Sequence, residues 1–157
     1  MTGVTVVIRA AQDTDLAAVR ALLQGAGLTT AGLREQLANF QVAEDESRIV
    51  ATAGLEVYGR GALLRSVAVD PAYRGRGIAR KLVTRLIHQA ELRGVAEVFL
   101  LTTSAAEYFR RFGFEPVPRE GVSAAVQASA EFGDECCTTA QAMRMRVGAS
   151  SRRSSPR

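Results

Sequence analysis

The segment that most constrains the fold is residues 63–90, where the pattern changes from strand to turn to helix. Residues 63–69 are apolar and rich in valine and leucine, which is typical of a buried strand. Asp70-Pro71 and the glycines Gly75 and Gly77 then indicate a turn. Apolar residues recur every fourth position after this turn, at Ile78, Leu82, Leu86 and Ala90. This spacing predicts a long amphipathic helix that Gly94 ends.

Such a turn is suited to binding an anion. Glycines leave the backbone N–H groups accessible, and the start of a helix adds partial positive charge. Arg74 and Arg76 add full charges. We therefore predict a pyrophosphate at this turn, with a merely tight strand-to-helix connection as the structural alternative. The order of residues matches no GxxxxGK[ST] phosphate loop, and the turn lacks the third glycine of a dinucleotide fingerprint.

The rest of the chain predicts several strands first and then alternating strands and helices. Apolar, β-rich runs predict strands at residues 4–9, 40–43, 48–57, 62–69, 95–102 and 142–147. Helical spacing predicts helices from residue 13 to the glycines at 25 and 27, and at residues 31–38, 78–94 and 105–112. This order predicts an α/β fold with a mixed, mostly antiparallel sheet and flanking helices.

Length and charge favour one domain. A chain of 157 residues with 47% hydrophobic residues fits a single globular unit, which we place at residues 1–147. Residues 148–157 are predicted to be a disordered basic tail, whose arginines carry most of the formal net charge of +4. The folded part is then nearly neutral, so no nucleic-acid partner is expected. The sequence has no membrane-spanning run and no secretory signal pattern, which predicts no membrane partner and a cytoplasmic location.

The cysteines and the histidine predict no metal site. Cys136 and Cys137 are adjacent and His88 is the single histidine, so a zinc ligand set is missing. Adjacent cysteines also fit a reducing compartment. Two thiols could capture a soft species such as trivalent arsenic, and the alternative is a pair of small apolar residues near the last strand.

Two motifs together resemble the GNAT superfamily of N-acetyltransferases. The first is Arg74-x-x-Gly77-x-Ala79 after residues 67–69, and the second is the helix at residues 105–112 that ends in Gly113-Phe114. The motifs cover residues 63–114, and the order of elements extends the likeness to about residues 7–147. The resemblance implies the GNAT fold, with the strands at 62–69 and 95–102 splayed apart to admit acetyl-CoA as the cosubstrate.

The resemblance also implies which residues hold acetyl-CoA. The backbone of Val67 and Val69 would bind the pantetheine arm, and the amides of residues 74–79 would hold the pyrophosphate. Thr103 and Phe109 would lie near the cofactor. The complete set is Val67, Ala68, Val69, Arg74, Gly75, Arg76, Gly77, Ile78, Ala79, Thr103 and Phe109.

Two branches of the superfamily are similar to this chain. Residues 33–37 and 101–103, followed by Tyr108-Phe109, resemble the acetyltransferase domain of N-acetylglutamate synthase. Residues 124–132 are closer to stand-alone N-acetyltransferases found with arsenic-resistance genes, the branch we favour. This resemblance implies an enzyme that acetylates a small amine, an amino acid or similar compound, with a link to arsenic resistance. A non-catalytic acetyl-CoA-binding module is the alternative, and a homodimer is left open.

The catalytic groups of the family do not carry over directly. Leu63 stands where many relatives have a glutamate base, and Phe109 stands where they have a tyrosine acid. Glu56 is the nearest acidic candidate for the base, and Tyr108 is the nearest phenol for the acid. For both residues the alternative is a purely structural role.

Arg65 has two interpretations. Strand alternation predicts that it shares a face with Leu63 and Val67, toward the expected cleft. An arginine there could anchor a substrate carboxylate, or it could form a buried structural ion pair. Glu56 falls where the synthase has its glutamate-binding lysine, so free glutamate is not the expected acceptor.

Overall fold

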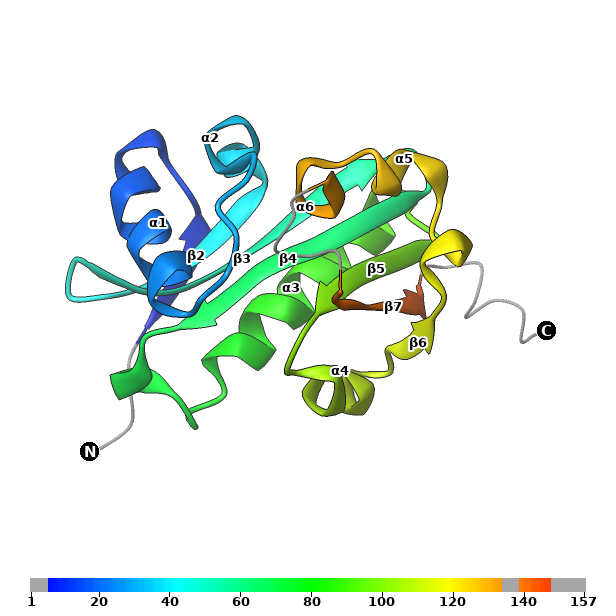
Figure 1. The fold of residues 1–157 in the computed structure, drawn as a ribbon. Coiled ribbons are helices and arrows are strands. Elements are labelled where there is room, and N and C mark those ends of the chain that lie inside the picture. Colours follow the sequence, from blue (N-terminus) through cyan, green and yellow to red (C-terminus); the bar gives the residue numbers. More distant parts are fainter. Residues whose placement is uncertain (1–5, 134–138, 148–157) are drawn as a thin grey trace. The chain divides into compact units, whose positions relative to one another are not determined.

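The computed structural model describes residues 6–133 and 139–147 (Figure 1). Within these residues, seven strands form one sheet in the order β1-β2-β3-β4-β5-β7-β6. The strands are β1 (Val7–Ala10), β2 (Phe40–Asp45), β3 (Arg48–Tyr58), β4 (Gly61–Val69), β5 (Glu97–Thr102), β6 (Glu115–Val117) and β7 (Gln141–Arg146). Antiparallel pairing joins β1 to β2, β2 to β3, β5 to β7 and β6 to β7. Strands β4 and β5 are parallel.

The helices lie between these strands along the chain, singly or in pairs. They are α1 (Leu16–Gly25), α2 (Leu33–Gln36), α3 (Ile78–Leu92), α4 (Ala106–Phe112), α5 (Ala124–Gln127) and α6 (Ala130–Gly133), with 3-10 turns at Asp13–Asp15, Leu37–Asn39, Pro71–Tyr73 and Arg119–Gly121. None of the helices in the described ranges is long and apolar enough to cross a membrane. The predicted mixed, mostly antiparallel sheet with flanking helices is confirmed.

The chain divides into two compact units. Within the described residues, the first contains residues 6–55 and Ser66–Leu86, and the second contains Glu56–Arg65 and residues 87–133 and 139–147. Strands β3 and β4 and helix α3 each contribute residues to both units. Each unit has its own apolar core, so each is described separately.

In the first unit, α1 and α2 pack on a face of the sheet. Val19 and Leu23 of α1, Leu33 of α2, Phe40 of β2 and Ala68 of β4 belong to one buried cluster. The predicted helical stripe of α1 therefore lies against the strands. This packing fixes α1 beside the end of β4, next to the turn that leads into α3.

In the second unit, α5 and α6 cover another group of strands. Leu63 of β4 and Phe99 of β5 form a buried cluster with Val126 of α5 and Phe132 of α6. Tyr58, at the end of β3, packs against the same cluster. Strand β6 and helices α5 and α6 were not predicted, because each spans only three or four residues, too few for a periodic pattern.

Phe40 and Gly54 form a tight cross-strand pair between β2 and β3. A Cβ placed on Gly54 would lie 2.5 Å from the ring of Phe40. The ring is completely buried in the first core. Glycine at position 54 therefore makes room for the aromatic ring beside it.

Strand β4 changes its backbone conformation at Ser66, which has a left-handed φ of 62°. Such a residue interrupts strand alternation. The predicted grouping of Arg65 with Val67 on one face therefore does not extend across Ser66. Strands β4 and β5 pair through the first three residues of each strand, which are Gly61–Leu63 on β4 and Glu97–Phe99 on β5.

Candidate functional site

The loop at residues 70–79, here called the glycine turn, follows β4 and leads into α3. The Asp70 carboxylate accepts a hydrogen bond from the Ala72 amide at 2.8 Å and caps the first short turn. Gly75 and Gly77 then adopt left-handed φ values of 79° and 78°. No atom lies within 4 Å of a Cβ built on either glycine, so their backbone is uncrowded and the need for glycine is conformational.

The start of α3 provides free amide donors beside these glycines. The Gly77 carbonyl accepts the first intrahelical bond, from the Lys81 amide at 3.1 Å. The amides of Ile78 and Ala79 precede this bond and have no acceptor within the helix. The helix runs for 15 residues, so its positive end acts on the same place. The predicted stripe of α3 is confirmed, because Ile78, Leu82, Leu86 and Ala90 are all buried.

Two arginines flank the glycine turn. The Arg74 Nε donates to the carbonyl oxygen of Val69 at 3.2 Å. The Arg76 guanidinium lies 5.6 Å from the ring centre of Tyr73, whose hydroxyl donates to Asp45. That hydrogen bond raises the pKa of Tyr73 above its ordinary value. The turn thus combines backbone amides, a helix start and two cations, which is the donor set expected for a pyrophosphate.

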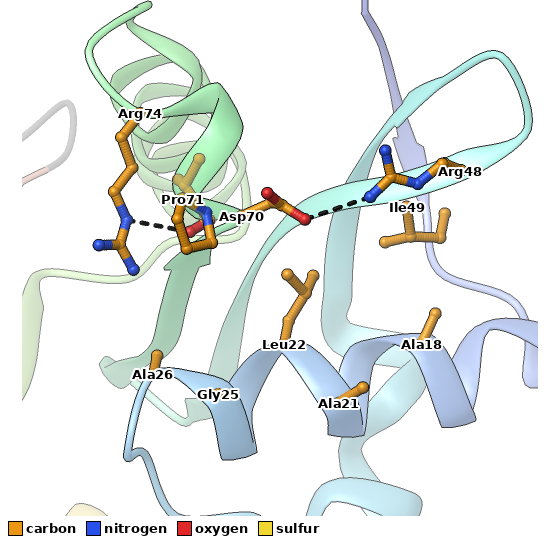
Figure 2. A pocket seen from close by; sticks show the side chains of 11 residues that line it. Ala18, Ala21, Leu22, Gly25, Ala26, Arg48, Ile49, Asp70, Pro71 and Arg74 are labelled. Carbon is orange, nitrogen blue, oxygen red and sulfur yellow. Dashed lines mark hydrogen bonds and ion pairs between the residues drawn. The ribbon is translucent and has the colours of Figure 1, made fainter.

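A cavity of about 330 Å³ lies beside the glycine turn in the first unit (Figure 2). Apolar residues of α1 form one side, where Ala18, Ala21 and Leu22 are labelled. The opposite rim holds the Arg48–Asp70 ion pair at 3.2 Å. Arg74 lines both the turn and the cavity. An apolar hollow therefore adjoins the anion-binding groups.

A second group of polar residues, here called the buried polar cluster, lies in the second unit and consists of Glu56, Tyr58 and Arg65. The Arg65 Nη1 donates to Glu56 Oε2 at 2.9 Å, and the Tyr58 hydroxyl donates to Glu56 Oε1. The side chains of Arg65 and Glu56 are 0% and 1% exposed. Of the two interpretations of Arg65, the buried ion pair is formed, with Glu56 as its partner.

Tyr58 is the member of this cluster that the sequence analysis missed. Burial and the bond to Glu56 raise the pKa of its phenol above the ordinary value, and the charge of Glu131 on α6 adds to this effect. Alternation along β3 places residues 56 and 58 on one face, so the pattern could have linked them. A tyrosine at a strand end is most often interpreted as core packing, and alternation alone does not show that two side chains on one face share a hydrogen bond.

The predicted site residues Val67, Ala68 and Val69 end β4 in the first unit, whereas Thr103, Tyr108 and Phe109 lie in or shortly before α4 in the second unit. Tyr108 contacts Phe109 and Phe112 edge to face, with ring centres 5.1 and 5.6 Å apart. Phe109 is buried and also contacts Phe114, whereas Thr103 is exposed. Gly113 ends α4 with a left-handed φ of 109°. Tyr108 thus lies in an aromatic group, and its role as an acid stays a prediction. Cys136, Cys137 and the tail at 148–157 lie outside the described residues.

Comparison with known proteins places this geometry in a family. A family model described as the acetyltransferase (GNAT) domain matches residues 36–116, slightly more than half of the chain. An amino-acid acetyltransferase from Pseudomonas syringae pv. syringae is 36% identical over 86 residues, 54% of this chain and 20% of the relative. One from Edwardsiella ictaluri is 32% identical over 119 residues, 70% of this chain and 27% of the relative. The chain therefore spans about a fifth to a quarter of these relatives.

Solved structures show the same fold. N-acetylglutamate synthase from Neisseria gonorrhoeae, complexed with coenzyme A and N-acetyl-glutamate, superposes with a TM-score of 0.79 at 20% identity. The match covers 93% of this chain and 36% of that one. Rv2747 from Mycobacterium tuberculosis, in a complex that contains coenzyme A, has a TM-score of 0.73 at 24% identity. Here the match covers 90% of this chain and 99% of that chain.

Proposed function

The chain belongs to the GNAT acetyltransferase family, and on this premise we propose that it is an N-acetyltransferase that moves an acetyl group from acetyl-CoA to a small amine. The observation that carries the proposal is the glycine turn. Two left-handed glycines, the free amides at the start of α3 and two arginines all lie within residues 74–79. The cavity beside it offers space for an apolar part of the same ligand.

Acetyl-CoA fits these groups. Its pyrophosphate would be held by the amides of residues 74–79, and its pantetheine arm would follow the backbone of Val67 and Val69. The Arg74 Nε donates to the Val69 carbonyl at 3.2 Å in this structure, so a hydrogen bond from Nε to a phosphate oxygen would replace that contact. When bound, acetyl-CoA supplies an activated acetyl thioester. Thr103 and Phe109 are proposed to lie near this thioester.

The acceptor is proposed to be an amino acid or an amino-acid-like amine. Relatives called amino-acid acetyltransferases support this class. The proteins themselves are longer than this chain, so the substrate does not follow from their names alone. Arg65 forms an ion pair with Glu56 in this structure, which argues against a direct contact between Arg65 and a substrate carboxylate. The role of Arg65 as a substrate anchor stays a prediction. A link to arsenic resistance and a homodimer also stay predictions.

Positioning is proposed to supply much of the rate. An amine that is held unprotonated beside the thioester reacts far faster than in free solution. The chain's own residues must hold the amine, exclude water and accept one proton. Glu56 is proposed as the final proton acceptor, and Tyr108 as the donor of a proton to the departing sulfur.

The direct test mixes the protein with acetyl-CoA and a panel of neutral, acidic and basic amino acids and amines. Release of the free coenzyme A thiol reports transfer, and mass spectrometry identifies the acetylated product. We expect thiol release that depends on the amine. Tight binding of acetyl-CoA without thiol release from any amine would contradict the proposal.

A non-catalytic acetyl-CoA-binding module is the second candidate. Leu63 is completely buried in the second core, and Phe109 is also buried. These two positions are therefore apolar packing residues and offer no acid or base. The same panel separates the candidates, because a binding module protects acetyl-CoA without consuming it.

A further inference from the structure

The buried polar cluster combines two side chains that are closed to solvent with one that is only partly buried. Arg65 and Glu56 are 0% and 1% exposed in their side chains. Tyr58 is only partly buried and donates its proton to Glu56 Oε1. We propose, on the premise of the acetyltransferase function, that Tyr58 relays the proton of the acceptor amine to Glu56.

Direct contact between the amine and Glu56 is difficult in this arrangement. One carboxylate oxygen already accepts from Arg65 and the other accepts from Tyr58. An amine would have to displace one of these donors and enter a site closed to solvent. The phenol has no such limitation, because a hydroxyl that donates its proton keeps lone pairs with which to accept another hydrogen bond.

The relay passes the equivalent of one proton from the amine to Glu56 through two coupled proton movements. As the amine nitrogen bonds to the acetyl carbon, the C–S bond of the thioester breaks and the sulfur leaves as a thiolate, which takes a proton from Tyr108 that solvent later replaces. The N–H bond of the amine also breaks, and its electron pair stays on nitrogen. This proton forms a new O–H bond on Tyr58, while the former Tyr58 proton bonds to Glu56 Oε1. Tyr58 ends neutral, Glu56 ends as a carboxylic acid, and Arg65 keeps its charge. The proton on Glu56 returns to solvent through Tyr58 after the product leaves.

The surroundings of Tyr58 favour transfer in one motion. The groups whose charges act on its phenol are Glu56 on β3, Arg65 on β4 and Glu131 on α6. Two carboxylates and burial disfavour a separate phenolate, and the raised pKa of Tyr58 reflects this. The two proton movements are therefore expected to occur together. Arg65 acts as a positioning residue that fixes the orientation of the Glu56 carboxylate.

Removal of the phenol is the first test. Tyr58→Phe keeps the ring in the second core and deletes the relay oxygen, so we expect kcat to fall about 100-fold, the size of a general-base contribution. The affinity for acetyl-CoA should stay unchanged. Glu56→Gln should lower kcat by a similar factor. Glu44→Gln is the matched control, because it also removes a carboxylate from an ion pair, with Arg9 on β1, and should leave kcat unchanged.

A second variant separates a relay from mere packing. Replacement of Tyr58 by 3,5-difluorotyrosine keeps the ring and the hydroxyl but lowers the phenol pKa. The basic limb of the pH–rate profile, where the ionised phenol can no longer donate to Glu56, should therefore shift toward lower pH. A structural role would leave that profile in place. Unchanged kcat and an unchanged pH profile in both Tyr58 variants, with an active native protein, would overturn the relay alone. An absence of acetyl transfer by the native protein would overturn the proposed function and the relay together.

Discussion

The glycine turn and the buried polar cluster are built in opposite ways. The glycine turn uses backbone amides, two left-handed glycines and exposed arginines, all from one short stretch of chain. The buried polar cluster uses side chains of β3 and β4, of which Glu56 and Arg65 are closed to solvent and Tyr58 is partly buried. A backbone site tolerates change in its side chains but not in its conformation. A side-chain cluster has the reverse sensitivity, and the variants below test this contrast.

The largest effect is expected from Arg65→Leu. This change leaves the Glu56 carboxylate buried without its cation, which should cost about 3–5 kcal/mol in the free energy of unfolding. Urea denaturation followed by circular dichroism measures the loss. The double variant Glu56→Gln with Arg65→Leu should recover a large part of it, because no charge is then left unpaired. Equal stability of the single and double variants would show that the pair is not coupled.

Gly77→Asp should break the glycine turn with little change to the core. The left-handed φ of 78° costs a non-glycine residue about 1–2 kcal/mol, and the new carboxylate repels a phosphate. We expect the affinity for coenzyme A to fall at least about tenfold by calorimetry. Gly59→Asp is the matched control, since Gly59 has a φ of 67° in the turn between β3 and β4. Equal affinity for coenzyme A in the two variants would contradict an anion site at the glycine turn.

Arg74→Gln and Arg76→Gln test how much the arginine side chains of the glycine turn contribute to coenzyme A binding. Because the amides supply the main contacts, each loss of an exposed arginine should weaken coenzyme A binding only several-fold, about 1 kcal/mol. The salt dependence of binding should also become shallower. Titrations at low and high salt measure both quantities. A loss as large as that of Gly77→Asp would mean that side chains, not amides, dominate the site.

Asp15→Asn is expected to have a smaller effect on stability than Arg65→Leu, because it removes a partly exposed ion pair. Asp15 accepts from Arg9 at 2.8 Å, but the Arg9 side chain is 28% exposed, unlike the sealed Glu56–Arg65 pair. The hydrogen bond from Arg9 lowers the pKa of Asp15 below its ordinary value. Its contribution to stability is therefore complete above about pH 4 and is lost as the pH falls through the lowered pKa.

We expect the variant to lose about 1 kcal/mol at neutral pH and part of the acid dependence. Denaturation midpoints between neutral and acidic pH measure this. Glu107→Gln removes a carboxylate that is 79% exposed and 4.0 Å from Arg110, and it should change neither quantity. If the stability of the Asp15→Asn variant fell with pH as much as that of the native protein, another carboxylate would control acid unfolding.

Local sequence predicted the parts of the molecule that local interactions form. The stripe from Ile78 to Ala90 marked α3, and Gly75 and Gly77 marked the turn, because helix periodicity and left-handed backbone depend on nearby residues. The pairing of Glu56 with Arg65 depends on how β3 meets β4, so periodicity gave each residue a separate role. Ser66 is a similar case, since a serine carries no signal for a left-handed φ. The roles assigned to the predicted site residues stay predictions.

The contact of Phe40 with Gly54 restricts which sequences this fold accepts. Position 54 has no room for a side chain while the phenylalanine ring occupies its side of the sheet. The two positions therefore share one fixed volume. Gly54→Ala alone should be destabilising, whereas the same change together with a smaller residue at position 40 should be tolerated better. Positions 40 and 54 are thus expected to vary together rather than singly when the sequence drifts.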